Sequence, residues 1–229
     1  MRMLHRIRKI CTISHKLFYM TKGFIEPQQQ RSRETSARLI AATLKALEEY
    51  GLEGATIPRI AELAGTAPAS VYRRFRDRNA LYRAAILDEM ERLILADRSM
   101  DTSGARTLED LGQLLVNDTL QQYRLRPGFM RAMTRFVETD TDEEFRKRAM
   151  QSITSGYEHL AGLVLAHRVR IQHKDPRKAI LFALLTMATL IEVRELSEVS
   201  VWKELSRTTD KQFTAEVTKN FLGYLLHPA

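Results

Sequence analysis

The chain has 229 residues, of which 44% are hydrophobic and 28% charged, a composition typical of a globular protein that buries a substantial core. Its single cysteine, Cys11, excludes an intrachain disulfide and a zinc site made of several cysteines. The single cysteine favours a reducing cytoplasm, and because no apolar run reaches the roughly 18 residues that cross a membrane, we expect no membrane partner. The formal net charge of +8 favours a polyanion as partner.

Residues 1–32 form a basic arm without a sustained hydrophobic period, and we expect this arm to be disordered. Residues 1–30 carry six lysines or arginines and one glutamate, so most of the net charge lies there. A basic arm suits DNA, because each neutralised phosphate releases counterions. An equally favoured alternative is that translation starts at Met20, and an organelle transit peptide is the least favoured one.

The first predicted helix covers residues 35–50, where apolar side chains recur at the helical spacing of three and four. Gly51 and Gly54 follow it and predict a turn. Thr56 is expected to cap a second helix with its side-chain oxygen, and Pro58 falls in the first turn of that helix, where proline is tolerated.

Gly65 is expected to end the second helix, because glycine takes a positive φ without strain. A third, short helix is predicted over residues 68–75, and Asp77 is expected to cap a fourth that covers residues 78–98. Two short helices joined by a tight glycine-containing turn form a helix-turn-helix. The sequence therefore predicts this motif over about residues 56–75.

The rest of the chain is also predicted to be helical, and it shows no strand-like alternation. The expected helices cover residues 107–124, 127–138, 142–173, 176–198 and 210–226. The predicted fold class is therefore all-α, with an N-terminal three-to-four-helix domain followed by a larger C-terminal helical bundle. We place the first domain at residues 33–85 and the second at residues 86–229.

The predicted third helix has two different faces. Val71 and Phe75 lie four residues apart and are expected to point into the core. The opposite face carries Pro68, Ala69, Tyr72 and Arg73. In helix-turn-helix proteins, an outward face of this kind enters the major groove of DNA.

Four arginines gather at the end of this helix and the start of the next, namely Arg73, Arg74, Arg76 and Arg78. Positive charges this close together are hard to explain by folding alone, but they are expected where the surface faces phosphates, to which arginine donates paired hydrogen bonds. We expect Tyr72 and Arg78 to contact phosphates and Arg73 to read guanine O6 and N7. The alternative, a solvated basic face, is favoured for any single arginine but not for the whole cluster.

A long, spaced pattern covers about residues 33–85. It consists of the helix Leu39–Gly51, Thr56, Ile60-Ala61, Ala64-Gly65, Val71-Tyr72, Phe75, Arg78 and Leu81. The pattern resembles the N-terminal domain of the TetR family of bacterial regulators. This resemblance implies a homodimeric repressor that binds a near-palindromic double-stranded DNA operator, and a C-terminal domain that binds a small-molecule effector and releases the DNA.

The resemblance also implies roles for individual positions. Phosphate contacts are implied for Thr56, Tyr72, Arg74 and Arg78. Positions near bases are implied for Thr66, Pro68, Ala69, Ser70 and Arg73.

The turn and the end of the third helix depart from the family pattern. The family usually has Gly-Val-Ser where this chain has Gly65-Thr66-Ala67, and the side chain of Ala67 cannot cap a helix. Thr66 is therefore the candidate cap, from one residue earlier. Because Arg73 and Arg74 replace the usual aromatic ending, specificity is expected to rest on Arg73, on thymine methyl contacts from Pro68 and Ala69, and on DNA shape.

An effector pocket is predicted in the helices that follow the helix-turn-helix domain. Its candidate residues are Phe129, Met133, Phe136, Ile153, Gly156 and Met187. Adaptable methionine and aromatic side chains suit a largely apolar or aromatic small molecule. Polar and small residues interrupt the apolar face of the predicted 142–173 helix and would leave room for a ligand. The favoured alternative is that these interruptions are ordinary variation within a core.

The last two long helices contain the most apolar stretches of the chain. On the first, Ile180, Leu184, Met187, Leu190 and Ile191 lie broadly on one side, and on the second so do Phe221, Leu222, Leu225 and Leu226. An apolar face without a partner in its own chain usually packs on another subunit. We therefore expect a homodimer through these helices, and the alternative is that they complete the core of the monomer.

No motif in the chain indicates an enzyme, because GxSxG, a phosphate-binding glycine loop and HExxH are all absent from the sequence. We expect no cofactor and no metal. Two other functions stay open: a transcriptional activator, or a DNA-binding dimer that ignores small molecules. A third class is an all-α ligand-binding or scaffold protein whose basic helix contacts another polyanion.

Overall fold

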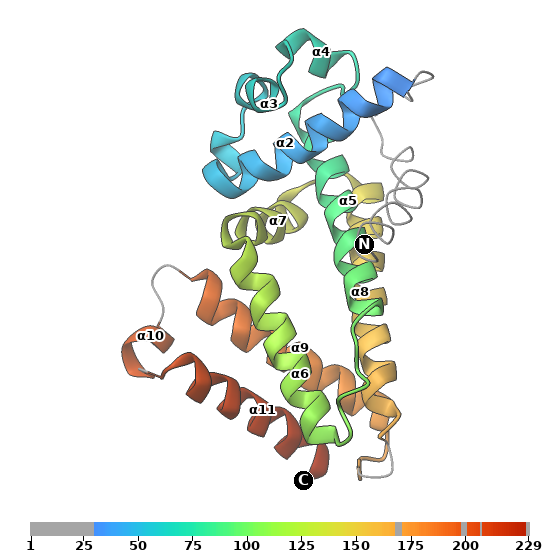
Figure 1. Ribbon diagram of the computed structural model, residues 1–229, viewed down its shortest axis with the longest axis vertical. Coiled ribbons are helices and arrows are strands. Elements are labelled where there is room, and N and C mark those ends of the chain that lie inside the picture. The colour runs from blue at the N-terminus through green and yellow to red at the C-terminus, as the bar shows by residue number, and fades with distance from the viewer. Residues whose placement is uncertain (1–29, 168–170, 198–200, 207, 228–229) are drawn as a thin grey trace. The chain divides into compact units, whose positions relative to one another are not determined.

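The structure, a computed structural model, describes residues 30–167, 171–197, 201–206 and 208–227. These ranges contain α helices and no strand, so the predicted all-α class is confirmed (Figure 1). The helices are α2 (Gln30–Gly54), α3 (Ile57–Leu63), α4 (Pro68–Tyr72), α5 (Arg78–Arg98), α6 (Leu108–Leu125), α7 (Pro127–Thr139), α8 (Glu143–Leu165), α9 (Pro176–Leu196), α10 (Val201–Leu205) and α11 (Asp210–Leu226). Of the predicted basic arm, residues 1–29 lie outside the described residues, whereas residues 30–32, which were expected to be disordered, belong to α2.

The chain forms two compact units, each described here by itself. The first contains the chain up to Leu95 together with Gly128–Ile153, and the second contains Ala96–Pro127 together with Thr154–Ala229. This division differs from the expected boundary at residue 85, because α7 and the first part of α8 group with the N-terminal helices. Which part of the chain carries which function stays a prediction.

The core of the first unit holds α2 to α5 together. Ile60 of α3 and Leu81 of α5 are fully buried. The hydroxyl of Tyr82 on α5 lies within hydrogen-bond distance of two carbonyl oxygens. It is 2.6 Å from that of Ala55 and 2.9 Å from that of Leu52, and it donates to them. This contact fixes the turn between α2 and α3 on α5, and burial raises the pKa of the Tyr82 hydroxyl.

Helix α7 begins against α2 within the first unit. The backbone N–H groups of Phe129 and Gly128 donate to the carboxylate of Glu48 at 2.6 and 3.3 Å. A carboxylate at the start of a helix satisfies free N–H groups and interacts favourably with the helix dipole. Glu48 therefore does for α7 what a cap residue does in other helices.

An ion pair joins α5 to the turn between α7 and α8. Arg83 contacts both carboxylate oxygens of Asp140, with Nε 3.0 Å from one and Nη2 2.9 Å from the other. The Asp140 side chain is 1% exposed, and its Oδ1 also accepts from the backbone N–H of Asp142. This bidentate pair fixes the position of the turn on α5.

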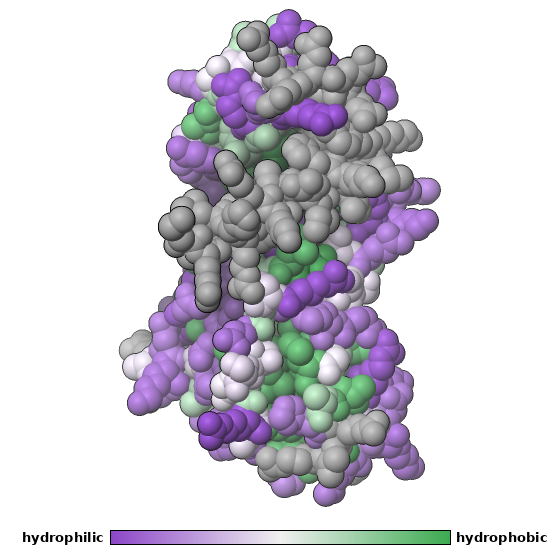
Figure 2. Space-filling view, turned by 45° about the vertical axis from the view of Figure 1, so that its right-hand side comes forward, coloured by the Kyte–Doolittle hydropathy of each residue, from purple (hydrophilic) through white to green (hydrophobic). Residues whose placement is uncertain are grey.

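In the second unit, α6, α9 and α11 pack around one apolar core. Its fully buried members include Val116, Val164, Ile180 and Leu184. The space-filling view shows a green, hydrophobic area on this unit, bordered by purple, hydrophilic residues (Figure 2). Part of the apolar side chains of the second unit therefore lies at its surface.

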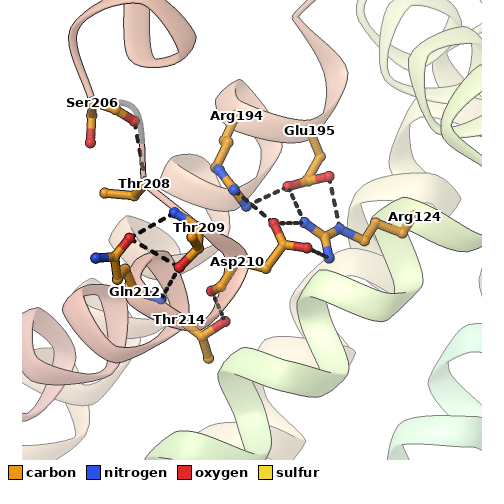
Figure 3. A network of polar contacts seen from close by, with 9 residues as sticks. All are labelled: Arg124, Arg194, Glu195, Ser206, Thr208, Thr209, Asp210, Gln212 and Thr214. Carbon is orange, nitrogen blue, oxygen red and sulfur yellow. Dashed lines mark hydrogen bonds and ion pairs between the residues drawn. The ribbon is translucent and has the colours of Figure 1, made fainter.

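A polar network ties the ends of α6 and α9 to the start of α11 (Figure 3). The guanidinium of Arg124 contacts Glu195 at 3.0 Å and Asp210 at 2.8 Å. Arg194 contacts the same two carboxylates at 2.9 and 2.8 Å. Two arginines and two acids therefore alternate in a closed ring. Arg124, followed by Arg194, lowers the pKa of Asp210 to about 2.

Several helix bounds differ from the sequence prediction, most of all the end of α8, and one short helix was missed. Helix α8 ends at Leu165, where residue 173 was expected, because the N–H of His167 bonds to Val164 in a tighter turn. Residues 168–170 of that predicted helix lie outside the described residues. The short helix α10 was not predicted, because five residues give no helical period to detect.

Candidate nucleic-acid interface

Helices α3 and α4 form the predicted helix-turn-helix. Gly65 has φ of +61°, the left-handed conformation that glycine alone adopts at little cost. The turn is closed by the N–H of Gly65 bonding to Glu62 and the N–H of Thr66 bonding to Ala61. Ala61 and Ala64 are both buried. The expected turn and the small residues beside it are therefore confirmed.

The two faces of α4 are also as predicted. Val71 and Phe75 are fully buried, so α4 and the residues after it are anchored in the core along one side. The residues expected on the outward face are exposed, namely Pro68, Ala69, Tyr72 and Arg73. Tyr72 exposes 56% of its surface, a large fraction for an aromatic side chain. The outward face is therefore accessible for contact with another molecule.

The expected side-chain caps of α3 and α4 are wrong. Thr56 is the N-cap of α3, but its side chain makes no cap hydrogen bond. The N-cap of α4 is Ala67, which has ψ of 147°, so Thr66 lies one residue outside the helix. The residue before a proline is pushed towards extended conformations, and Pro68 therefore fixes the N-cap at Ala67. Asp77, in contrast, caps α5 through the N–H of Ala80 as predicted.

The structure places Ser70 away from the outward face. Ser70 exposes 9% of its surface, and its Oγ accepts from Nη2 of Arg73 at 2.8 Å. Its carbonyl oxygen accepts from Nη1 of Arg74 at 2.9 Å. Burial, followed by the charges of Arg73 and Arg38, lowers the pKa of Arg74.

The arginines of the predicted cluster differ in exposure. Arg73, Arg76 and Arg78 are exposed, whereas Arg74 is half-buried. In the part of the chain that the structure describes, Arg73, Arg76 and Arg78 form no ion pair with a carboxylate. Arg59, on α3, instead lies over the ring of Tyr50 and donates to the carbonyl of Gly54. The exposed positive charge therefore lies at the end of α4 and the start of α5.

The predicted effector residues fall in both units. Phe129 and Phe136 are buried in the first unit, where the Phe136 ring meets those of Tyr82 and Phe145 edge to face at 5.6 and 5.4 Å. Met133 and Ile153 are half-buried and belong to the same unit. Gly156 and Met187 are buried in the second unit. The six residues therefore stay a predicted pocket.

The second unit contains a polar group of residues that sequence reasoning missed. The side-chain amide of Gln122 donates to Asp97 at 2.9 Å and to Asp118 at 2.8 Å. Burial raises the pKa of both carboxyls. A second pair joins Tyr123 to Glu192 at 3.4 Å. The spacing of Asp118 and Gln122, four apart on the amphipathic helix α6, was the available signal.

The exposed apolar residues of α9 are not those named from the sequence. Of the expected interface residues, Ile180, Leu184, Met187, Ile191, Phe221 and Leu225 are buried within their own unit. The exposed ones on α9 are Phe182 (57%), Leu185 (49%) and Val193 (38%). The Phe182 ring contacts that of Tyr224 on α11 at 5.1 Å. A groove of about 580 Å³, lined by residues of α9, α11 and the segment before α11, adjoins this surface at Tyr224.

Two absences concern the described residues. None of their helices combines the length and hydropathy needed to span a bilayer. No three of their histidine, aspartate or glutamate side chains come close enough together to hold a metal ion.

Comparisons with known proteins point to one family. The sequence model of the bacterial regulatory proteins of the tetR family matches residues 39–85. The transcriptional regulator RutR of Escherichia coli K12 is 33% identical over 70 residues, or 29% of this chain and 33% of RutR. This match therefore spans only a third of the length of RutR.

A further relative and a solved structure of similar fold cover most of the chain. The transcriptional regulator BetI of Klebsiella pneumoniae strain 342 is 26% identical over 190 residues, or 81% of this chain and 92% of BetI. The regulator FadR of Bacillus subtilis, solved in complex with stearoyl-CoA, superposes with a TM-score of 0.59 over 82% of this chain and 97% of its own. At 14% identity, that superposition shows a shared fold.

Proposed function

Because the chain belongs to the TetR family of bacterial regulatory proteins, we propose that it is a DNA-binding transcriptional regulator and acts as a repressor. The observation that carries this proposal is α4, which is anchored by Val71 and Phe75 and presents an exposed outer face. At its end lie exposed arginines that form no ion pair with a carboxylate within the described residues, namely Arg73, Arg76 and Arg78. A short helix presented in this way fits the major groove, and the arginines then lie where phosphates pass.

The side chains of α4 and the residues around it make two kinds of contact with the DNA, to bases and to phosphates. Arg73 reads a guanine edge, and Pro68 and Ala69 contact thymine methyl groups. The phosphate contacts come from Thr56, Tyr72, Arg74 and Arg78, and Thr66 lies near the bases. The hydroxyl of Thr56 suits this role, because it makes no cap hydrogen bond in α3. Since few of these groups are base readers, DNA shape contributes to specificity.

The active form is a homodimer joined through α9 and α11. Phe182, Leu185 and Val193 supply an exposed apolar strip on α9, and burial in a second subunit would remove it from water. A two-fold dimer presents two copies of α4 to two half-sites, about one helical turn apart. The operator is therefore near-palindromic.

A small, largely apolar effector releases the repressor from DNA. The FadR structure of similar fold was solved with stearoyl-CoA, a molecule with a long apolar chain. Phe129, Met133, Phe136, Ile153, Gly156 and Met187 are the proposed contacts. Asp97, Asp118 and Gln122 could orient a bound molecule, because pockets combine apolar walls with a few polar groups. If no apolar or aromatic compound raised the melting temperature, this part of the proposal would be withdrawn.

The proposed regulator is tested by binding to the DNA upstream of its own gene. The protein is titrated at two salt concentrations with random duplex as competitor. We expect one discrete complex that resists the competitor, and an affinity that falls steeply with salt. Equal competition by random DNA would contradict a specific regulator and favour a basic helical protein with another polyanionic partner.

Two matched variants assign the effect to the arginines of the helix-turn-helix. Arg78→Ala should weaken binding to all sequences and make the salt slope shallower by about one. Arg106→Ala removes the same charge from an exposed site in the second unit and should leave both quantities unchanged. Similar effects of the two variants would show that net charge, rather than the helix-turn-helix, drives binding.

A further inference from the structure

One contact at the end of α4 sets the direction of an exposed side chain. Ser70 and Arg73 lie three residues apart, on adjacent turns of the helix. The Arg73 Nη2 lies 2.8 Å from the Ser70 Oγ, and the side chain of Arg73 is otherwise exposed. A long side chain at an exposed site is usually free among many rotamers, whereas this one is held at its tip.

Ser70 is better placed to act on Arg73 than to contact a base itself. Only 9% of its surface is exposed, and its hydroxyl oxygen already accepts a hydrogen bond from Arg73. Arg73 uses one of its five N–H groups for this contact, so the others remain for an external acceptor. A guanidinium fixed at one corner keeps a forked pair of donors available in a set orientation.

Such an orientation matters for reading a base and much less for contacting a phosphate. The paired acceptors O6 and N7 of guanine accept both donors only when the guanidinium lies in the plane of the base. Phosphate oxygens accept hydrogen bonds from a wide range of directions, and contacts to them carry no sequence information. Loss of the contact should therefore reduce discrimination between bases and leave the overall attraction to DNA.

We propose that Ser70 is a positioning residue, whose hydroxyl holds the Arg73 guanidinium in the orientation that reads a base pair. This inference rests on the proposed function, because it assumes that α4 meets DNA. Arg74 provides an internal contrast. It bonds to the carbonyl oxygen of Ser70 rather than to the side chain, so replacing the hydroxyl leaves the partner of Arg74 in place.

The test is selection from a pool of duplexes with a randomised central segment. The full chain is used as wild type, Ser70→Ala, Ser70→Thr, Arg73→Ala and the double variant Ser70→Ala/Arg73→Ala. The readouts are the base preference at each position, the affinity for one unselected duplex, and the thermal unfolding of each variant. The unfolding curves show whether each variant is folded.

We expect Ser70→Ala to reduce the preference about tenfold at one position in each half-site. That position should be the one at which Arg73→Ala reduces the preference, and the double variant should be no worse than Arg73→Ala alone. Affinity for the unselected duplex should stay within about twofold, because the phosphate contacts remain. Ser70→Thr keeps a hydroxyl and should keep the preference.

Other outcomes overturn the inference. Folded Ser70→Ala that selects the wild-type sequences would show that the hydroxyl does not control Arg73. Independent, additive losses in the double variant, or a loss at a different base position, would do the same. If the wild-type protein itself enriches no sequence, the proposed function fails, and the positioning role fails with it. That case is recognisable, because wild type and variants then bind every duplex alike.

Discussion

A β carbon on Gly128 would lie 2.1 Å from the carbonyl oxygen of Glu48, closer than two such atoms ever come. The same Glu48 binds the first N–H groups of α7 with its carboxylate, so the two contacts together press the start of α7 onto α2. Only glycine permits this approach, because the atom in the way is a backbone carbonyl oxygen, which cannot change rotamer as a side chain can.

The first prediction follows from that contact. Gly128→Ala should lower the free energy of unfolding by about 1–3 kcal/mol or more, because the added methyl group overpacks a rigid site. Gly162→Ala is the matched control, since a β carbon there meets nothing within 4 Å, and it should stabilise α8 by about 0.5–1 kcal/mol. Urea unfolding of the two variants decides the question, and equal stabilities would contradict the close approach.

The second prediction concerns the Arg83–Asp140 ion pair in the first unit. Asp140→Ala should destabilise the protein by up to about 3–5 kcal/mol, because it leaves the largely buried guanidinium of Arg83 with only its longer contact to Asp142, at 3.6 Å. Arg135→Ala breaks an ion pair of the same type with Glu53, in which both side chains are more than 60% exposed. That control should cost less than about 1 kcal/mol. Similar midpoints in guanidinium chloride would refute the difference.

The third prediction is a pH dependence that depends on Asp210. Its pKa falls from the ordinary value of 3.8 to about 2 in the folded chain. A lowered pKa means that the unfolded chain takes up the proton first, so the carboxylate stabilises the fold above pH 4 and this stabilisation is lost as the pH falls from about 4 to about 2. Because the side chain is 60% exposed, the loss should not exceed about 1 kcal/mol.

Asp210→Asn should therefore reduce the urea midpoint at pH 5 and have a smaller effect at pH 3. Glu216→Gln, on the same helix and exposed, has none of these ion pairs and serves as the control. If Asp210→Asn changed the midpoint equally at both pH values, the ring of Figure 3 would contribute nothing through the ionised carboxylate.

The fourth prediction tests the apolar strip on α9. Phe182→Glu and Leu185→Glu should convert the proposed dimer into a monomer, because each places a charge where the proposed partner would bury an apolar side chain. Leu125→Glu changes a leucine that is 76% exposed and should leave the dimer intact. Sedimentation equilibrium distinguishes the two results. A dimer that persisted in both α9 variants would place the interface elsewhere.

Prolines and capping residues made most helix starts predictable. Pro127 and Pro176 stand at the first position of α7 and α9, and Asp77 caps α5, as expected from the preferences of these residues. The cap of α4 was missed because the conformational effect of Pro68 on its neighbour outweighed the hydrogen-bonding capacity of Thr66.

The outward side of α9 could not be predicted from periodicity. Ile180 and Leu184 are buried while Phe182 and Leu185 are exposed, so apolar residues occupy nearly the whole circumference of the helix. A pattern without a polar side does not show which side faces the core. The Ser70–Arg73 contact was not predictable for a different reason, since only the three-dimensional structure shows which way a small polar side chain on a five-residue helix points.

The first unit is assembled from two separate stretches of sequence, with Ala96–Pro127 looping out between them. A gene fragment that stops at residue 95 would lack α7 and the first half of α8, and would expose the surfaces that they cover. A chimera that joins parts of two such chains at a single junction would therefore mix two incomplete cores. A workable chimera needs three junctions, near residues 95, 128 and 153, so that each core is inherited whole.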